Sequence, residues 1–296
     1  MQAPALKRVA LIGFGEAGSL LAAGLAAQGT AVCAYDIKAH GSEQAAMQQR
    51  ANNAHVTLAA SLEQALDNAD LAISAVTASS AAQVALDAGR LMHQGQYFLD
   101  INSVSPATKA HDRDAIESGG AAYVEAAVMA PVPPYGLRVP MLLGGKQSAA
   151  LSESLNTLGL NTRAVSQDVG VASAIKMCRS VMIKGLEALT LECLSAARRF
   201  GAEQAVLASL DETFPSMGWT ENLPDYLISR VAEHGRRRAA EMREVAQTLS
   251  EVGVDPVMAS ATAQVHDALI DLMAQEGVGY PSGAFNWPVF VDQLKP

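Results

Sequence analysis

The chain has 296 residues, of which 50% are hydrophobic and 17% charged, a composition typical of a globular protein. This length predicts two domains, each large enough to have its own core. The formal net charge of −9 argues against nucleic acid as a partner, because a phosphate backbone requires a basic face. The three cysteines, Cys33, Cys178 and Cys193, do not have the spacing of metal ligands. We therefore expect buried, reduced thiols and no metal site.

The first residues lead directly into a predicted strand and contain no apolar segment followed by a small-residue cleavage site. No uninterrupted apolar run reaches membrane-spanning length. We therefore expect a soluble, cytoplasmic protein with a small-molecule substrate and no membrane partner.

A glycine-rich turn follows the first predicted strand, residues 8–14, and precedes a predicted helix at 19–28. A GxGxxG pattern alone is weak, but between a strand and a helix it predicts a dinucleotide-binding loop. The first glycine permits the tight turn, the second lets the pyrophosphate approach the backbone, and the third lets helix and strand pack closely. Free N–H groups at the helix start then bind the phosphates. The predicted cofactor-binding residues of this loop are Gly13, Phe14, Gly15, Glu16, Ala17 and Gly18.

Asp36 ends the next predicted strand, residues 30–36. A carboxylate at this position accepts hydrogen bonds from the ribose hydroxyls of adenosine and repels a 2′-phosphate, so it favours NAD over NADP. The positive charge of Lys38 offsets part of that repulsion, and NADP remains possible.

Strands and helices alternate up to about Ser166, with further strands predicted at 71–76, 97–102, 122–128 and 140–143. This alternation indicates an α/β fold with a Rossmann-type, doubly wound parallel sheet. Ligands bind beyond the carboxyl ends of such strands, which adds Val76, Thr77 and Asn102 to the predicted cofactor contacts. The hydroxyl residues at these ends are also candidates for ordinary helix N-caps, and taken singly that is the commoner role of Thr77, Ser79, Ser103 and Ser105.

The segment 129–136 (MAPVPPYG) contains three prolines, which stiffen it and remove backbone donors. It presents shape and apolar surface to a ligand, or it is a plain connection between strands. The sequence leaves both interpretations open.

Helical patterning fills the rest of the chain, which predicts a dinucleotide-binding domain at 1–166 and an all-helical substrate and dimerisation domain at 167–296. Helices are expected at 168–200, 202–213, 223–233, 236–252 and 259–275. The first is mostly apolar, so we expect it to be buried with its one polar stripe facing a cleft. Polar residues of that stripe recur at three- or four-residue steps: Ser173, Lys176, Ser180, Lys184 and Glu187.

One basic cluster, Arg236 to Arg238, is either a solvated helix start or an anion site, and His234 beside it is equally open. A lysine on a buried helix is costly unless it is used or paired. For Lys184 a structural role is the more frequent outcome.

Three segments together resemble the β-hydroxyacid dehydrogenases, which include 3-hydroxyisobutyrate, tartronate-semialdehyde and 6-phosphogluconate dehydrogenases. They are GFGEAG with Asp36, DINSVSP at 100–106, and GVASAIKMC at 170–178. The resemblance implies that Lys176 is the catalytic acid/base and that the turn of Asn102 and Ser103 lies near nicotinamide and substrate. It also implies a homodimer or larger assembly through the helical domain. The strings KMCRSVMIKG and HGRRRAAEM resemble a bacterial subgroup whose helical domain has no assigned function.

Two positions depart from the family pattern. The substrate loop Ser-Gly-Gly is replaced by Met129-Ala130-Pro131, and the asparagine pair after the lysine is replaced by Arg179-Ser180. In the family these positions hold the substrate's carboxylate and hydroxyl, so the usual substrates do not follow from the resemblance.

The resulting hypothesis is hydride transfer between a nicotinamide and a β-hydroxy acid or related polar alcohol. Desolvation and the charges of Arg179 and Lys184 are expected to lower the pKa of Lys176 toward the range of a general base. Arg179 offers paired donors to a carboxylate, and Ser180 lies one turn from Lys176. The alternatives are a non-catalytic dinucleotide-binding sensor and an imine reductase-like enzyme on the same scaffold.

Overall fold

The computed structural model describes residues 3–294. The chain divides after Lys176 into two compact units, which we call the Rossmann unit and the helical unit. The division falls inside one long helix, α8 (Val171–Phe200), which starts in the first unit and continues in the second.

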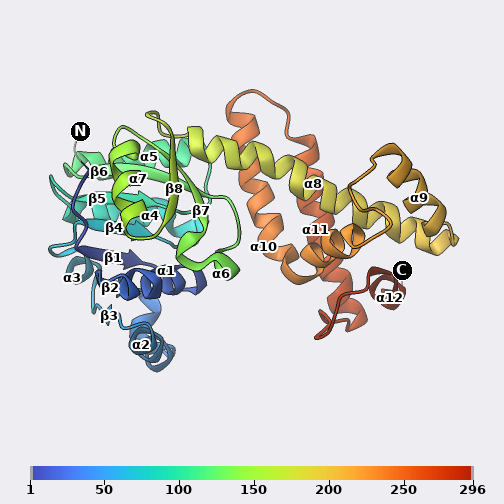
Figure 1. Ribbon diagram of the computed structural model, residues 1–296, viewed down its shortest axis with the longest axis horizontal. Coiled ribbons are helices and arrows are strands. Elements are labelled where there is room, and N and C mark those ends of the chain that lie inside the picture. The colour runs from blue at the N-terminus through green and yellow to red at the C-terminus, as the bar shows by residue number, and fades with distance from the viewer. Residues whose placement is uncertain (1–2, 295–296) are drawn as a thin grey trace. The chain divides into compact units, whose positions relative to one another are not determined.

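The Rossmann unit is built on an eight-stranded sheet with the order β3-β2-β1-β4-β5-β6-β7-β8 (Figure 1). All neighbouring strands are parallel except β6 and β7. The chain order reverses between β1 and β4, where doubly wound sheets bind their ligands. The predicted fold class is therefore confirmed. The strands are β1 (Arg8–Ile12), β2 (Ala31–Tyr35), β3 (Thr57–Leu58), β4 (Leu71–Ser74), β5 (Tyr97–Asp100), β6 (Ala122–Val128), β7 (Pro140–Gly144) and β8 (Asn161–Ser166).

Helices cover both faces of this sheet, because successive side chains of each strand point to opposite sides. Leu11 joins the core under α1, α2 and α7, whereas Ile12 joins the core under α3, α4 and α5. The helices are α1 (Glu16–Ala27), α2 (Gln44–Asn53), α3 (Leu62–Leu66), α4 (Ala78–Leu91), α5 (Pro106–Ser118) and α7 (Ser148–Thr157).

Two strands were not predicted. The first, β3, has two residues, too few for an alternating pattern, and β8 carries polar side chains along the edge of the sheet. The antiparallel pairing of β7 was also not predicted. Its cause is the connection 129–139, which turns the chain back through a short α6 (Val132–Tyr135) and η2 (Gly136–Arg138) without a crossover helix.

The helical unit contains most of α8 together with α9 (Glu203–Thr213), α10 (Leu223–Glu251), α11 (Val257–Glu276) and α12 (Trp287–Gln293). The two helices predicted at 223–233 and 236–252 are the two segments of α10, which meet at a kink at His234, where the backbone is not helical (φ −130°). Beside the kink α10 and α11 are in close contact, since a Cβ on Gly235 would lie 2.6 Å from Ile270 Cγ1. Among residues 3–294 no helix combines the length and apolar character needed to cross a membrane.

Candidate active site

The glycine loop joins β1 to α1 at the carboxyl edge of the sheet, and each glycine has the predicted geometric role. Gly13 has φ +90°, and a Cβ there would lie 2.5 Å from the carbonyl oxygen of Ala75. A Cβ on Gly18 would lie 2.0 Å from the carbonyl oxygen of Gly13, so helix and turn are in close contact. A Cβ on Gly15 would meet no atom within 4 Å, so the backbone there is accessible to a phosphate at the start of α1. The residues present therefore fit a dinucleotide.

Asp36 follows β2 at the same edge and is fixed by two backbone donors. Phe14 N–H donates to Oδ2 (2.7 Å) and Lys38 N–H donates to Oδ1 (3.0 Å). The ammonium of Lys38 pairs with Glu43 (3.0 Å), so its charge is already engaged by another carboxylate. The negative charge at the end of β2 is thus held in place beside the glycine loop.

Arg50 of α2 was not singled out in the sequence, where nothing marks it apart from other surface arginines. Its guanidinium donates to the carbonyl oxygen of Phe14 (2.8 Å). The glycine loop is therefore held by Asp36 through the Phe14 N–H and by Arg50 through the Phe14 carbonyl.

Asn102 lies beyond β5 and is buried. Its Oδ1 accepts from Val76 N–H (2.8 Å) and its Nδ2 donates to Ser74 Oγ (2.9 Å), so it joins the carboxyl ends of β4 and β5. This arrangement fixes the Val76–Thr77 turn, which begins α4, and brings three of the predicted cofactor contacts together. Ser103, next in the chain, is half-buried, whereas Ser105 caps α5 through the Thr108 N–H, the commoner role named above.

A buried network behind β5 supports Asn102, and sequence reasoning missed it. Asp100 accepts from the Asn102 N–H (2.9 Å), the Lys109 ammonium (2.9 Å) and the Tyr123 hydroxyl (2.8 Å). Burial and the nearby Asp100 raise the pKa of Tyr123 well above its ordinary value, so the phenol stays a donor. Asp112 lies close by, with its Oδ1 3.5 Å from Nδ1 of His111, and burial followed by repulsion from Asp100 raises its pKa to about 6.

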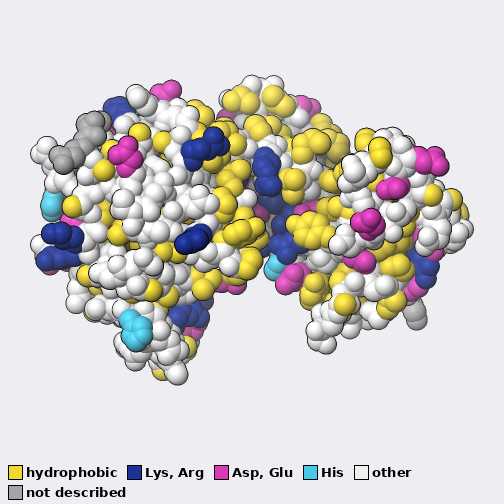
Figure 2. All heavy atoms as spheres, in the orientation of Figure 1, with side chains coloured by type: hydrophobic (Ala, Val, Ile, Leu, Met, Phe, Trp, Pro, Cys, Tyr) yellow, Lys and Arg dark blue, Asp and Glu magenta, His cyan; other side chains and the backbone are white. Residues whose placement is uncertain are grey.

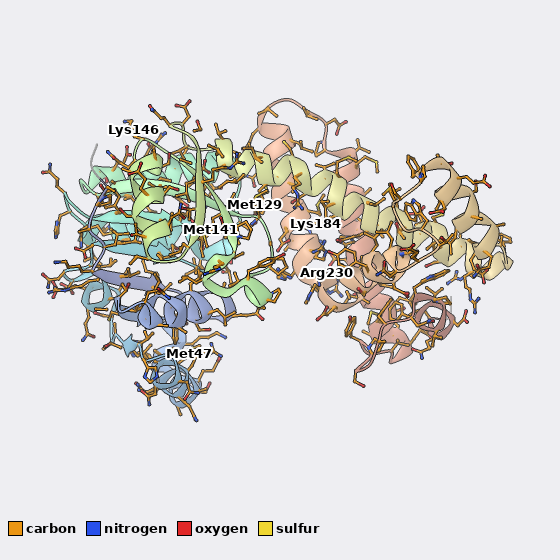
Figure 3. All side chains as sticks on the ribbon, viewed as in Figure 1. Met47, Met129, Met141, Lys146, Lys184 and Arg230 are labelled. Atoms are coloured by element: carbon orange, nitrogen blue, oxygen red, sulfur yellow. The ribbon has the colours of Figure 1, made fainter. Side chains whose placement is uncertain are left out.

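The proline-containing loop starts at Met129, directly after β6 and beside Met141 of β7 (Figure 3). Its backbone N–H donates to the carbonyl oxygen of Pro140 (2.9 Å), and its side chain is half-buried. Further along, Leu137 packs against Gly24 of α1, where a Cβ would lie 2.8 Å from it. One part of the loop is therefore packed on the fold, while Met129 stays at the edge where the other candidate residues lie.

Helix α8 begins at this edge, and its start is bound to the sheet. Glu125, buried in β6, accepts hydrogen bonds from Gly170 N–H (2.7 Å), Ala172 N–H (3.0 Å) and the Ser173 hydroxyl (2.7 Å). Lys176 is half-buried and lies one turn after Ser173. The predicted catalytic lysine is thus on the first turns of a helix that is anchored to β6.

The expectation that α8 buries its apolar sides was wrong in part, because Met177, Leu191 and Leu194 are buried but other apolar side chains are not. Ser173, Ser180, Lys184 and Glu187 are buried, whereas apolar side chains at seven-residue spacing are exposed: Ile175 (40%), Met182 (74%) and Leu189 (55%). The polar stripe is buried because its members find polar partners. Arg179 is exposed, and Ser180 lies on the buried side, so these two predicted substrate contacts face different directions.

Charged residues of the stripe pair with α10 inside the helical unit, where Lys184 and Arg230 can be located in Figure 3. Lys184 pairs with Glu241 (2.7 Å), and Glu187 binds the Arg238 guanidinium through two hydrogen bonds. Burial lowers the pKa of Lys184 and raises that of Glu187, and in each case the partner's charge opposes the shift. These ion pairs give Lys184 a structural role.

The basic cluster at 236–238 follows the kink of α10 at His234, and the side chains of Arg236 and Arg237 are 53% and 58% exposed. Arg236 pairs with Asp267 and Asp271 of α11, and Arg237 pairs with Glu241. With Arg238 on Glu187, every member of the cluster has a carboxylate partner. The reason is that the cluster lies within α10, where its side chains reach acidic residues of neighbouring helices and turns.

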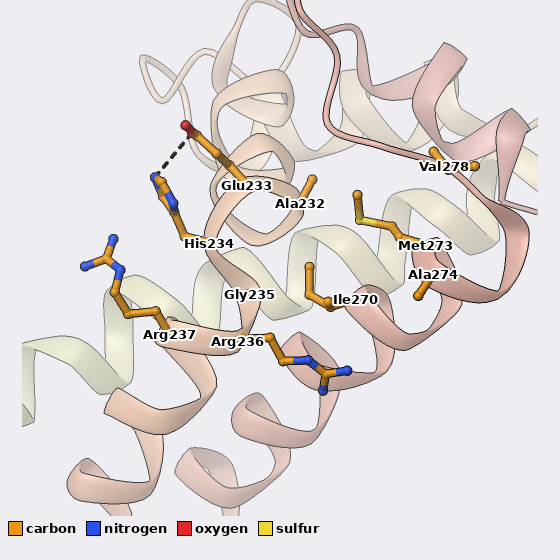
Figure 4. Close-up of a pocket in the computed structure, with 10 residues that line it drawn as sticks. All are labelled: Ala232, Glu233, His234, Gly235, Arg236, Arg237, Ile270, Met273, Ala274 and Val278. Carbon is orange, nitrogen blue, oxygen red and sulfur yellow. Dashed lines mark ion pairs between the residues drawn. The ribbon is translucent and has the colours of Figure 1, made fainter. Parts of the chain in front are cut away.

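A cavity of about 500 Å³ lies at the kink of α10, lined by α10, by α11 and by Val278 (Figure 4). His234 lies on its rim and pairs with Glu233 (3.3 Å). Burial, followed by the charge of Arg230, lowers the pKa of this imidazole. The apolar part of the cavity comes from Ile270 and Met273.

The cysteine prediction was wrong in part. All three thiols are free, but Cys178 and Cys193 are exposed on α8 and only Cys33 is half-buried, with its pKa raised by burial. Cys178 and Cys193 lie on the side of α8 that carries the exposed apolar residues. Within residues 3–294 no group of three or more His, Cys, Asp or Glu side chains is arranged to hold a metal ion.

Fold and loops together define a nicotinamide-dinucleotide-binding protein with a separate helical unit. Residues 8–149 match the family model of the NAD binding domain of 6-phosphogluconate dehydrogenase, and residues 197–269 match a domain of unknown function, DUF1932. A conserved hypothetical protein from Sinorhizobium meliloti is 38% identical over 98% of this chain and 96% of its own, with a TM-score of 0.81. Conserved protein MTH1747, described as structurally similar to 3-hydroxyacid dehydrogenases, is 34% identical over 90% and 98%, with a TM-score of 0.74.

More distant structures share the fold. The 3-hydroxyisobutyrate dehydrogenase of Mycobacterium tuberculosis aligns over both whole chains with a TM-score of 0.75 and 14% identity. An imine reductase of Streptomyces aurantiacus aligns over 98% of this chain and all of its own, with a TM-score of 0.56 and 19% identity. The chain therefore belongs to the family of 3-hydroxyacid dehydrogenase-like proteins, in the group that carries the DUF1932 domain.

Proposed function

We propose that the protein is an NAD-dependent dehydrogenase of a β-hydroxy acid or a related polar alcohol. The observation that supports this most strongly is the shared edge of the Rossmann unit. There the open glycine loop and Asp36 fit a dinucleotide, and the anchored start of α8 carries Lys176.

Bound nicotinamide supplies the hydride acceptor for the hydroxyl-bearing carbon. Lys176 takes the hydroxyl proton as the carbonyl forms and returns it in the reverse direction. Ser180, one helical turn after Lys176, is the candidate donor to the reacting oxygen, whereas Arg179 is exposed on a different side of α8 and takes no part in this mechanism. Asn102 acts through the Val76–Thr77 turn that it holds.

Substrate contacts from the Rossmann unit are assigned to Ser103 and Met129, which flank the ends of β5 and β6. Methionine in place of the family's serine removes a hydrogen-bond donor and adds an apolar, adaptable side chain. This favours a substrate that presents an apolar group on that side, rather than a polyhydroxylated sugar acid.

A panel of hydroxy acids tests the activity. The protein is incubated with NAD or NADP and each of a set that includes 3-hydroxyisobutyrate, L-serine and bulkier β-hydroxy acids, while the absorbance of reduced nicotinamide is followed. We expect reduction of NAD with at least one of the less hydroxylated members. No reduction across the panel, together with tight NAD binding, would overturn the dehydrogenase in favour of a dinucleotide-binding sensor. Reduction of cyclic imines by NADPH without any alcohol oxidation would instead identify an imine reductase.

We also propose that the protein forms a homodimer through the exposed side of α8. Ile175, Met182 and Leu189 repeat every seven residues, the spacing at which two helices bury apolar side chains against each other. A two-fold axis would bring the same stripe of a second copy onto the first and close the assembly.

Light scattering of the wild type and two variants tests this assembly. Met182→Glu should shift the mass from dimer toward monomer, because it places a charge in an apolar interface. The matched control is Leu86→Glu on α4 of the Rossmann unit, which should leave the mass unchanged. A monomeric wild type would contradict the proposal. We further propose that the protein is cytoplasmic, which cell fractionation tests.

A further inference from the structure

Glu125 is a lone carboxylate in an otherwise apolar strand, and it is completely buried. Its Oε1 accepts from the backbone N–H groups of Gly170 (2.7 Å) and Ala172 (3.0 Å). Its Oε2 accepts from the Ser173 hydroxyl (2.7 Å) and the Ser173 N–H (3.3 Å). All four donors belong to the start of a single helix.

A buried carboxylate is costly unless hydrogen bonds and charge compensate it. Here both conditions are met, because the first N–H groups of a helix have no partner within it and the helix dipole favours a negative charge. Glu125 therefore serves as the N-terminal cap of the 30-residue helix α8, although it comes from a strand far away in sequence.

The backbone around this carboxylate is shaped to admit it. A Cβ on Gly144, its register neighbour in β7, would lie 2.5 Å from Glu125 Oε1. Gly170 adopts φ +105° immediately before α8, a conformation that favours glycine. A side chain at position 144 would therefore displace the Glu125 carboxylate, and a side chain at position 170 would be strained by the positive φ and would crowd Pro106.

Glu125 also lies beside Asp100, the other buried carboxylate that fixes a segment near the site. It is the register neighbour of Asp100 in β5, and Asp100 binds the Asn102 N–H. Two adjacent strands thus each use a buried carboxylate to fix another segment: Asp100 fixes the residues directly after β5, and Glu125 fixes the start of α8, which follows β8. One segment carries Asn102 and the other carries Lys176.

We propose that Glu125 is a positioning residue for Lys176: by capping α8 it sets the height and rotation of the helix turn that presents the lysine to substrate. It touches neither substrate nor cofactor. The inference rests on the proposed function, because it assumes that the position of Lys176 matters for proton transfer. A displacement of about 1 Å in a reacting group lowers rate by roughly a hundredfold, so a carboxylate that fixes this helix has a measurable effect on turnover.

Three variants test the proposal, with turnover measured on any alcohol that the wild type oxidises. Glu125→Gln keeps the size but turns an amide N–H₂ toward the helix donors, and we expect kcat to fall roughly 10- to 100-fold while the Kd for NAD stays within about twofold. Glu125→Asp keeps the charge and should recover part of that loss. The control is Ser152→Ala, which removes the buried contact with Thr162 (2.8 Å) between α7 and β8; it should lower stability but leave kcat unchanged.

A second measurement does not depend on activity. Lysines are labelled by reductive methylation with ¹³C-formaldehyde, and the Lys176 resonance is assigned by its loss in Lys176→Ala. In Glu125→Gln we expect this resonance to move, because the start of α8 loses the carboxylate that fixes it. Ser152→Ala should not change it.

The outcomes separate the two proposals. An unchanged Lys176 resonance in both Glu125 variants would overturn the positioning role. Full turnover in Lys176→Ala would overturn the proposed base, whereas a shifted resonance in Glu125→Gln would still support the control of Lys176 by Glu125. If Glu125→Gln does not fold, the comparison is made with Glu125→Asp, for which normal kcat together with an unshifted resonance counts against the proposal.

Discussion

Buried carboxylates occur in both units, but they bind different kinds of partner. In the Rossmann unit Glu125 accepts from backbone N–H groups and one hydroxyl at the start of α8, and Asp100 accepts from the Asn102 N–H. In the helical unit the buried Glu187 instead pairs with the guanidinium of Arg238, and the partly exposed Glu241 pairs with the buried ammonium of Lys184. The first arrangement fixes loops at the edge where the site lies, and the second fixes the packing of one helix against another.

A carboxylate that binds backbone donors therefore has a different structural effect from one that pairs with a cationic side chain. Backbone donors have a defined place in the chain. A carboxylate that binds them therefore fixes the position of the segment to which those donors belong. Side-chain ion pairs tolerate small movements of both partners and mainly affect stability. Changes in the helical unit should therefore alter the free energy of unfolding, whereas changes in the Rossmann unit should alter the site.

The largest stability effect is expected for the pair of Glu187 and Arg238. Arg238→Leu leaves Glu187 buried without its cation and should lower the free energy of unfolding by about 3–5 kcal/mol in urea titration. The double variant with Glu187→Leu removes both charges and should recover most of that loss. If Arg238→Leu unfolds like the wild type, or if NAD binds it more than about tenfold weaker, the division of roles between the units is wrong.

Asp112 should produce a pH-dependent effect in the Rossmann unit. Its pKa is raised from 3.8 to about 6 in the folded protein, so folding favours the protonated form and stability is lost as pH rises from about 4 through 6. The loss amounts to about 3 kcal/mol once the carboxyl is ionised. Asp112→Asn should therefore be more stable than the wild type above about pH 6, with the difference vanishing below about pH 4.

Asp114 provides the matched control for this experiment. It lies on the same helix, its side chain is 70% exposed, and it pairs with Arg113. Asp114→Asn should change the pH dependence of unfolding by less than about 1 kcal/mol. Equal pH profiles for Asp112→Asn and the wild type would show that the buried carboxyl does not titrate as described.

The smallest effect concerns cofactor choice. Asp36→Ala removes the charge that repels a 2′-phosphate and should narrow the ratio of Kd values for NADP and NAD by about tenfold, or 1.4 kcal/mol, in fluorescence titration. Asp36→Asn keeps an acceptor for the Phe14 N–H and separates loss of charge from loss of the loop contact. A wild type that prefers NADP would refute the assignment.

The geometry of the glycine loop could be predicted from the sequence because its determinants are local. Gly13 and Gly18 are required by backbone contacts within a few residues or across one strand, and the pattern of strand, turn and helix carries that information. The orientation of α8 was not predictable in the same way. Periodicity shows that polar and apolar residues occupy different sides, but only the ion pairs with α10 reveal that the polar side faces inward.

The supporting residues were missed for a related reason. Glu125 and Lys109 act on segments or strands that the sequence does not place beside them, and single charged residues in apolar or helical stretches have many uses. The lone acidic residue in the strand 122–128 was the one available signal, because a charge in a buried strand requires a partner. Arg50 gave no signal at all, since its contact with the Phe14 carbonyl depends on how α2 folds back toward the loop.

In the proposed reaction Lys176 provides the base for hydride transfer at the edge of the Rossmann unit that binds NAD. The most direct test of this role compares wild type and Lys176→Ala with NAD and the best alcohol of the panel, together with the Kd for NAD. We predict that kcat falls roughly 100- to 10,000-fold while NAD binds equally well, because a general base of this kind contributes that much. Near-full kcat in Lys176→Ala would show that Lys176 is not the base.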